Sequence, residues 1–294
     1  MTSAQFGVNR SEIQAHKLFV EGDNNSLDAT VLKKLLPRIS IVPLGPSHSI
    51  KNAAQALVTA HPNYYFLVDR DYHDDDFVEQ SWRCFPDPDK YNLLIWRKRE
   101  LENYFLDPNY LMLSSYLKKG VDRAGLERLI IKHAQQRLYL DVANQVIISM
   151  RESLKKSWIS LLSNPDDFPS KEVAIERLEA LSECVEHLNL TQNTLGVSGR
   201  VDSFNAILQS WSGGSDQLAF GVGDWQNQMS GKKILNKVIT DCFRVPKQDD
   251  PGWCSQKFAC KAVVKELLNK DLHHQPDDFQ KLYNLIQQRI ASDR

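Results

Sequence analysis

The sequence has no long apolar run, no excess of either charge and few cysteines. None of its apolar stretches reaches the roughly 20 residues that a membrane-spanning helix needs, so we expect no membrane segment. The 294 residues carry a formal net charge of −1, so any nucleic-acid binding must use a local basic patch rather than the whole surface. The first residues also lack the charged and apolar regions of a signal peptide.

Cysteine and glycine motifs are missing as well. The five cysteines contain no Cys-x-x-Cys pair, which argues against a zinc ribbon. Their odd number, together with the missing signal, favours reduced thiols and a cytoplasmic protein. The absence of a P-loop and of Gly-x-Gly-x-x-Gly disfavours a nucleotide-binding protein of the doubly wound class.

Short apolar runs alternate with helical patterns in the first part of the chain. We expect strands over 17–20, 39–44, 64–68 and 91–96, and helices over 27–36 and 49–60. Such alternation with short connections predicts a parallel sheet with right-handed crossovers, which is the α/β class.

Acidic residues follow the first and third strands. The first ends in Glu21, and the third ends in Asp69-Arg70-Asp71. Strand alternation points Asp69 and Asp71 to the same side, at the strand ends where α/β sheets bind ligands. Converging carboxylates repel each other unless a divalent cation binds them. The alternative is an ordinary turn, because aspartate favours turns and helix caps.

The rest of the chain is less patterned. Residues 72–90 are expected to form a loop, in which His73–Asp76 is a solvated acidic segment rather than a metal cluster. Trp82, Trp96 and Tyr104 are expected to pack in the core. Beyond Pro108 we expect helices to about residue 190, including Trp158, Leu161 and Leu162, then a looser glycine-rich stretch over 191–231, and helices from Gly231, over 256–270 and over 276–291.

Four segments carry a family resemblance. LFVEGD (18–23) and LVDRD (67–71) resemble the TOPRIM fold, the catalytic module of topoisomerases, primases and overcoming-lysogenization-defect nucleases. RKRELENYFLDP (97–108) and GKKIL (231–235) are similar to two segments of a TOPRIM-containing family that includes the AriB-like nucleases of the PARIS anti-phage system. The resemblance implies a TOPRIM-like parallel sheet flanked by helices, with a mainly helical additional region.

The resemblance also implies a function. The implied protein is a metal-dependent endonuclease that acts as a toxic defence effector and cleaves RNA such as tRNA. An ABC-type ATPase would hold it inactive, and the released nuclease would act as a homodimer. Two alternatives remain: a DNA nuclease of the overcoming-lysogenization-defect type, or a non-catalytic module that binds the ATPase. The second is disfavoured because Glu21, Asp69 and Asp71 are all present.

The expected site combines this resemblance with phosphodiester chemistry. Cleavage needs charge stabilisation on the attacking and leaving oxygens, which Mg²⁺ or Mn²⁺ held by a few carboxylates can supply. The expected metal ligands are Glu21, Asp69, Asp71 and Glu102. Glu102 has an alternative as a salt-bridge partner of Arg97 or Arg99, and the number of metals stays open because Asp23, Asn24 and Asn25 fill the gap where the family has a second acid.

The remaining assignments concern phosphate and nucleic acid. The expected catalytic residues are Glu21, Asp69, Asp71 and Lys232, the last placed at a helix start that itself attracts anions. Lys232 and Lys233 could instead be an ordinary solvated pair. Nucleic-acid contacts are expected from Arg97, Lys98, Arg99 and Lys232, whereas Asp23 and Asp28 are expected to be cap or turn residues.

The expected domain division has three parts. Residues 1–107 form the catalytic domain, 108–225 form a helical region that offers a docking surface to the ATPase, and 226–294 form helices that pack back on the catalytic domain.

Overall fold

The computed structural model describes residues 16–57, 59–71, 73–87, 92–155, 170–179, 182–215, 217–247 and 252–292. The chain divides into two compact units. The first, the sheet unit, comprises residues up to 136 together with 224–294, and the second, the helical unit, comprises 137–223. Residues 108–136, which the expected division placed in the helical region, therefore belong with the sheet.

The sheet unit is built on four parallel strands, which confirms the α/β class. Its first elements are β1 (Lys17–Val20), α2 (Leu27–Leu35), β2 (Ser40–Pro43), α3 (Ser47–Leu57), β3 (Tyr64–Val68), α4 (Asp75–Cys84) and β4 (Leu93–Ile95). The strand order is β2-β1-β3-β4, with every neighbouring pair parallel. The two central strands, β1 and β3, are those that end in the acidic residues.

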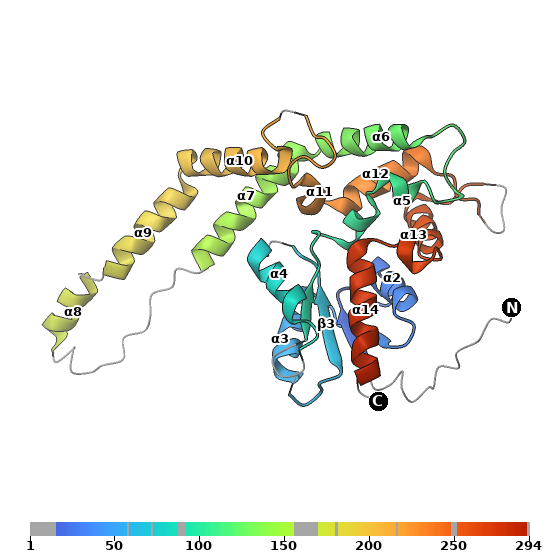
Figure 1. The fold of residues 1–294 in the computed structure, drawn as a ribbon. Coiled ribbons are helices and arrows are strands. Elements are labelled where there is room, and N and C mark those ends of the chain that lie inside the picture. Colours follow the sequence, from blue (N-terminus) through green and yellow to red (C-terminus); the bar gives the residue numbers. More distant parts are fainter. Residues whose placement is uncertain are drawn as a thin grey trace. The chain divides into compact units, whose positions relative to one another are not determined.

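Helices cover both faces of this sheet. The strand β3 is buried along four of its five residues, as its unbroken apolar run predicts. Helices α3 and α4 lie on one face, and α2 lies on the other with the C-terminal helix α14 (Asp277–Ser292) (Figure 1). The chain leaves β1 toward β2 through α2, and it leaves β3 toward β4 through α4 on the opposite face. The strand order therefore reverses between β1 and β3. Open α/β sheets bind ligands at the carboxyl ends of the strands at such a reversal.

The elements of the sheet unit that follow β4 are all helical among the described residues, and several of them pack on one another. They are the 3₁₀ helix η1 (Leu101–Phe105), α5 (Pro108–Leu111), α6 (Arg123–Gln135), α11 (Trp225–Gln228), α12 (Gly231–Cys242), α13 (Gln256–Leu267), η3 (Leu272–His274) and α14. The ring of Phe279 on α14 lies 5.5 Å from that of Trp96 and 5.1 Å from that of Tyr104. Trp82, Trp96 and Tyr104 are all buried, as expected.

The loop expected over 72–90 is wrong, because α4 occupies most of it. The side chain of Asp74 accepts a hydrogen bond from the Phe77 N–H at 2.7 Å and so caps the helix. Val78 and Trp82 are buried side chains of the same helix. The acidic run is therefore the N-terminal turn of a helix, where negative charge is favourable. Tyr72 and residues 88–91, including the expected start of the fourth strand, lie outside the described residues.

The helical unit contains α7 (Leu138–Lys155), α8 (Lys171–Glu179), α9 (Ser182–Leu195) and α10 (Val197–Ser212). Helices α7, α9 and α10 pack on one another. A looser stretch was expected from residue 191, and this expectation is wrong in its first part. The 16-residue helix α10 covers that part and includes Gly199. Only the later glycines, at 213, 214, 221 and 223, adopt positive φ angles in a loop. Trp158, Leu161 and Leu162 fall outside the described residues.

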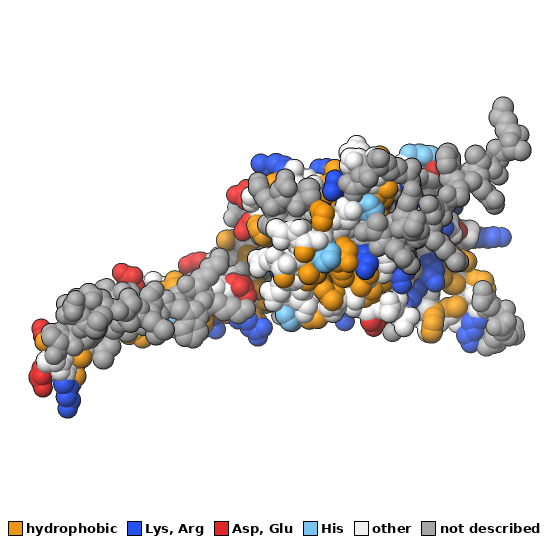
Figure 2. Space-filling view, turned by 90° about the horizontal axis from the view of Figure 1, so that it is seen from below, with side chains coloured by type: hydrophobic (Ala, Val, Ile, Leu, Met, Phe, Trp, Pro, Cys, Tyr) orange, Lys and Arg blue, Asp and Glu red, His pale blue; other side chains and the backbone are white. Residues whose placement is uncertain are grey.

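The surface agrees with the nearly neutral net charge. On the face shown in Figure 2, basic and acidic side chains are both mixed with hydrophobic and neutral ones. Within the part of the chain that the structure describes, no helix is both long and apolar enough to cross a membrane.

Candidate functional site

Glu21 and Asp69 lie side by side at the carboxyl edge of the sheet. They follow the neighbouring strands β1 and β3, and the Asp69 N–H donates a hydrogen bond to Glu21 Oε1 at 3.0 Å. Strand alternation does not place Asp71, because β3 ends at Val68 and Asp71 has a left-handed φ of 46°. Its N–H instead points to the Arg99 carbonyl at 3.4 Å. A turn, rather than the strand, therefore positions the second acid of the pair.

The Glu-Gly pair makes a tight turn into α2. Gly22 has a φ of +87°, and a Cβ at this position would lie 2.9 Å from the Cβ of Ser26. A side chain at Gly22 would therefore be strained and would meet Ser26. Ser26 caps α2 by accepting a hydrogen bond from the Ala29 N–H at 3.1 Å. Ser26 is therefore the N-cap, and Asp28 lies in the first turn of α2, where a carboxylate is favourable.

One cavity of about 700 Å³ collects most of the expected site. Its acidic and basic lining residues are Glu21, Asp23, Asp28, Asp69, Glu102, Lys232 and Lys261, and its lining also includes Asn25, Asn236, Gln256 and Cys260. The structure thus brings together three of the four expected metal ligands with Lys232. Asp71 does not line this cavity, although its charge acts on both Glu21 and Asp69.

Burial and mutual repulsion raise the pKa values of these acids. Burial, followed by the charges of Asp71 and Asp28, raises the pKa of Glu21 to about 7. Burial, followed by the charge of Asp28, raises the pKa of Glu102 to about 7. Carboxylates with such pKa values would be partly protonated at neutral pH unless a cation replaced the proton.

Two further acids complete the cluster. Burial is also the main cause that raises the pKa of Asp28 to about 6, with the charge of Lys232 opposing it. Burial, followed by the charges of Asp28 and Glu21, raises the pKa of Asp69 well above its usual range. Asp28 is the residue that the sequence interpretation missed. The signal that could have found it is the tight turn at Gly22, which returns the first turn of α2 to the end of β1.

The charges fall into two groups that share Asp69. Asp69 is influenced by all four of the other acids, Asp28, Glu21, Asp71 and Glu102. The charge of Lys51 acts on Glu21 and Asp71, whereas that of Lys232 acts on Asp28 and Glu102. Asp69 is therefore the acid on which all the others act, and a different lysine acts on each pair.

The start of α12 is held by the segment that follows β4. Glu100 Oε2 accepts a hydrogen bond from the Lys232 N–H at 2.8 Å and another from the Ser230 hydroxyl at 3.1 Å. A Cβ on Gly231 would lie 2.3 Å from Asn103 Oδ1, so η1 and α12 are in direct contact. The carboxylate of Glu100 therefore occupies the helix start that was expected to attract anions. What Lys232 offers is its exposed side chain.

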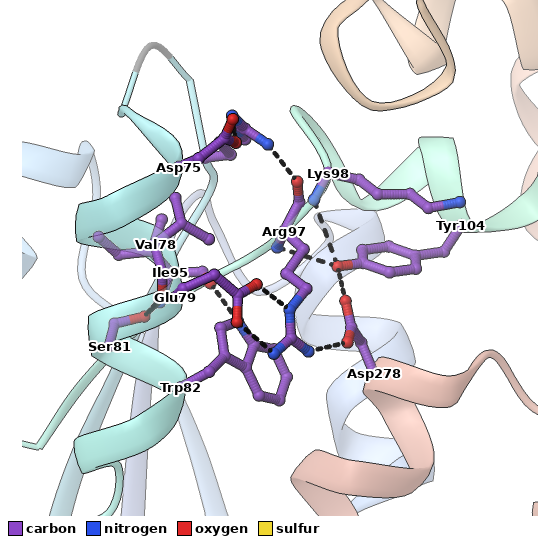
Figure 3. Close-up of polar contacts among 11 residues, drawn as sticks. Asp75, Val78, Glu79, Ser81, Trp82, Ile95, Arg97, Lys98, Tyr104 and Asp278 are labelled. Carbon is purple, nitrogen blue, oxygen red and sulfur yellow. Dashed lines mark hydrogen bonds and ion pairs between the residues drawn. The ribbon is translucent and has the colours of Figure 1, made fainter. Parts of the chain in front are cut away.

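Arg97 is committed to a structural network (Figure 3). Its guanidinium donates to both carboxylate oxygens of Glu79, at 2.6 and 3.0 Å, and to Asp278 on α14, and it lies 4.4 Å above the Trp82 ring. The Tyr104 hydroxyl donates to Asp278 at 2.6 Å and accepts from the Arg97 backbone N–H at 3.1 Å. Arg97 therefore joins β4, α4 and α14 and does not line the acidic cavity.

Lys98 and Arg99 are also drawn inward. Burial lowers the pKa of Lys98, whose ammonium lies 5.2 Å from the centre of the Tyr104 ring. Arg99 donates from its guanidinium to the Gln228 carbonyl at 3.0 Å, and its charge acts on Asp71. The expected basic run is therefore not one open patch, and only Arg99 is coupled to the acidic cluster.

The donor set suits a hard divalent cation. Among the described residues, no three acidic, histidine or cysteine side chains meet closely enough to coordinate one ion as they stand. The chemistry of the lining still fits Mg²⁺ or Mn²⁺, which prefer carboxylate oxygens and keep several waters. Five acids have raised pKa values and outnumber the nearby lysines Lys51, Lys232 and Lys261, which leaves an excess of negative charge for such a cation to neutralise.

Comparison of the chain with known protein families, with curated proteins and with solved structures finds no match. No relative therefore assigns a function to this cavity, and its chemistry has to be read from its own residues.

Proposed function

We propose that the chain is a metal-dependent endonuclease with a TOPRIM-like catalytic sheet. The observation that carries the proposal is the meeting of Glu21, Asp28, Asp69 and Glu102 with Lys232 in one cavity. These residues come from four separate segments, and the cavity lies at the strand reversal where α/β sheets bind ligands. The TOPRIM resemblance of LFVEGD and LVDRD supports the same two strand ends.

The two groups of acids suit a site for more than one cation. Glu21 with Asp71, and Asp28 with Glu102, would each hold Mg²⁺ or Mn²⁺, with Asp69 shared between them. Bound ions would supply charge stabilisation to the attacking and leaving oxygens of a phosphodiester. Lys232 would contact a phosphate oxygen of the substrate through its ammonium group. Glu100 would fix the position of Lys232 by capping α12.

RNA such as tRNA is the proposed substrate, and an ABC-type ATPase is the proposed partner that holds the nuclease inactive. Both follow from the resemblance of RKRELENYFLDP and GKKIL to the AriB-like family, as do a defence role and an active homodimer. Direct packing of these two segments, through Gly231 and Asn103, supports treating them as parts of one site.

The test is cleavage by the purified chain. It would be incubated with tRNA, single-stranded DNA and duplex DNA, in Mg²⁺, Mn²⁺ or EDTA. We expect metal-dependent cleavage of tRNA and a loss of at least roughly 100-fold in Asp69→Asn. Asp76→Asn, at an exposed position on α4, is the matched control and should cleave at the wild-type rate.

Three outcomes would change the proposal. A wild-type chain that cleaves nothing in either metal would contradict the nuclease function. Equal rates for wild type and Asp69→Asn would move the active site away from this cavity. Cleavage of DNA but not of tRNA would support the nuclease function and contradict RNA as the substrate.

A further inference from the structure

Lys51 and His73 form a close pair beside the acidic cluster. Lys51 lies on α3 and His73 lies between β3 and α4, and Lys51 Nζ is 2.6 Å from His73 Nε2. The His73 N–H donates to the Arg70 carbonyl at 2.9 Å, and its ring packs 5.3 Å from that of Phe77. The backbone bond fixes the turn that carries His73, and the Phe77 ring orients its imidazole toward the lysine.

The chemistry of the contact fixes its direction. An ammonium group has three donors and no acceptor, so Lys51 donates and His73 Nε2 accepts. His73 Nε2 therefore acts as the acceptor that positions the Lys51 ammonium. One of the three Lys51 donors is used in this bond.

Lys51 lies close to the acids without pairing to them. Its charge acts on both Glu21 and Asp71. Within the described ranges, however, its only side-chain hydrogen bond is the one to His73, and no carboxylate is within ion-pair distance. A lysine that served only to neutralise the cluster would be expected to contact a carboxylate. Here the imidazole of His73 holds it, which leaves the acids for a cation and the ammonium for an anion.

We propose that Lys51, positioned by His73, is a second phosphate-binding group at the Glu21 and Asp71 end of the cluster, with the same role that Lys232 has at the Asp28 and Glu102 end. The subsite rests on the proposed nuclease function and deepens it. The nucleic-acid strand would have one phosphate on Lys232 and a neighbouring phosphate on Lys51, with the carboxylates between them.

The test separates phosphate binding from metal binding, because the two should change in opposite directions. Lys51→Gln removes a positive charge near Glu21, so Mn²⁺ measured by calorimetry without RNA should bind more tightly. Fluorescently labelled tRNA, measured by anisotropy in Ca²⁺, should bind roughly 5-fold more weakly, with a salt slope reduced by about 1. Lys33→Gln, at an exposed site in the last turn of α2, is the control and should change neither.

A second pair of variants tests the role of His73. His73→Gln keeps an acceptor for the lysine, whereas His73→Leu removes it, and both lose the ring contact with Phe77. We expect a raised KM for tRNA in His73→Leu, with kcat little changed, and a KM close to wild type in His73→Gln. Equal KM values in the two variants would remove His73 from the proposal.

The outcomes separate the subsite from the nuclease. If the wild-type chain cleaves tRNA and the Lys51→Gln and Lys33→Gln variants bind tRNA equally well, the subsite is overturned. The proposed nuclease function then still stands. Weaker binding of both Mn²⁺ and tRNA in Lys51→Gln, with a lower melting temperature, makes Lys51 a structural residue and also overturns the subsite. A wild-type chain that neither binds nor cleaves tRNA contradicts both proposals.

Discussion

The two units of the chain place polar and apolar groups in opposite ways. In the sheet unit, carboxylates are drawn into a cavity where burial raises their pKa values. In the helical unit, large apolar side chains remain on the surface. Of the 13 large apolar residues that are exposed among the described residues, ten lie between Tyr139 and Val222. Burial of carboxylates in the sheet unit and exposure of apolar side chains in the helical unit are both unfavourable. A bound cation can stabilise the carboxylates, and contact with another apolar surface can cover the exposed side chains.

A groove in the helical unit shows this most clearly. It has a volume of about 420 Å³ and lies between α7 and α10, where Val146, Ile147, Val201 and Phe204 are among its lining residues. The sheet unit, in contrast, buries Phe66, Trp96 and Phe279 almost completely. The difference teaches that buried charge and exposed apolar surface belong to separate parts of the chain, and it can be tested by variants that affect one part alone.

Among the variants that test this comparison of the two units, Asp28→Asn is expected to have the largest effect. Asp28 lines the cavity and is half-buried, so loss of its charge should weaken Mn²⁺ binding and slow tRNA cleavage, each by roughly 10- to 100-fold. Asp76→Asn, at an exposed position in the first turn of α4 and outside the cavity lining, is the matched control and should stay within a few fold of wild type. Mn²⁺ calorimetry and cleavage kinetics are the measurements. Equal effects of the two changes would return Asp28 to the role of a turn residue.

The next comparison separates Arg97 from Lys232. Arg97→Gln breaks a network with Glu79 and Asp278 and should lower the free energy of unfolding by about 2–3 kcal/mol. Lys232→Gln should leave the melting temperature unchanged, because its side chain is exposed, and should weaken tRNA binding by roughly 5-fold. Denaturant unfolding and anisotropy distinguish the two. A reduced salt slope for Arg97→Gln at unchanged stability would restore the open basic patch.

The acidic cluster should also make stability depend on pH. The pKa values of Glu21 and Glu102 are about 7 in the folded chain, against 4.5 for an ordinary glutamate. Between these values the folded state binds more protons than the unfolded state, so the free energy of unfolding falls as the pH rises. We expect the metal-free melting temperature to drop by roughly 5 °C from pH 5 to pH 8.

Saturating Mg²⁺ should reverse that drop, because the cation replaces the protons and binds only the folded chain. The double variant Glu21→Gln, Glu102→Gln is the control and should show a flatter pH profile. A metal-free melting temperature that rises with pH would show that these carboxyls are not strained in the folded state.

The smallest effect on catalysis is expected from Val201→Asp in the helical unit. Val201 is exposed and lines the groove, so the charge should not unfold the chain. Cleavage of tRNA by the free chain should remain at the wild-type rate, whereas co-purification with the proposed ABC-type ATPase partner should be lost. Asn205→Asp, on the same helix and outside the groove lining, is the control. Retained association in Val201→Asp would place the docking surface elsewhere.

The sequence predicted most of the sheet and part of the site, for a physical reason. Buried strands need unbroken apolar runs, so the strands ending at Val20 and Val68 could be recognised locally, as could the cap at Ser26. The expected loop over 72–90 failed because Asp74–Asp76 have the composition of a turn as well as that of a helix N-terminus. Only the burial of Val78 and Trp82 decides between them.

By itself, the sequence determined that acids follow two strands that become neighbours, because chain order and crossover handedness limit how parallel strands can pair. Tertiary structure alone decided which other charges join them. Asp28, Glu102 and Lys232 are far apart in sequence and meet because α2, η1 and α12 pack around the same sheet edge. Packing also took Arg97 away from the surface, since Asp278 lies 181 residues further along the chain. Local sequence carries no record of such contacts, because each depends on where another segment is placed.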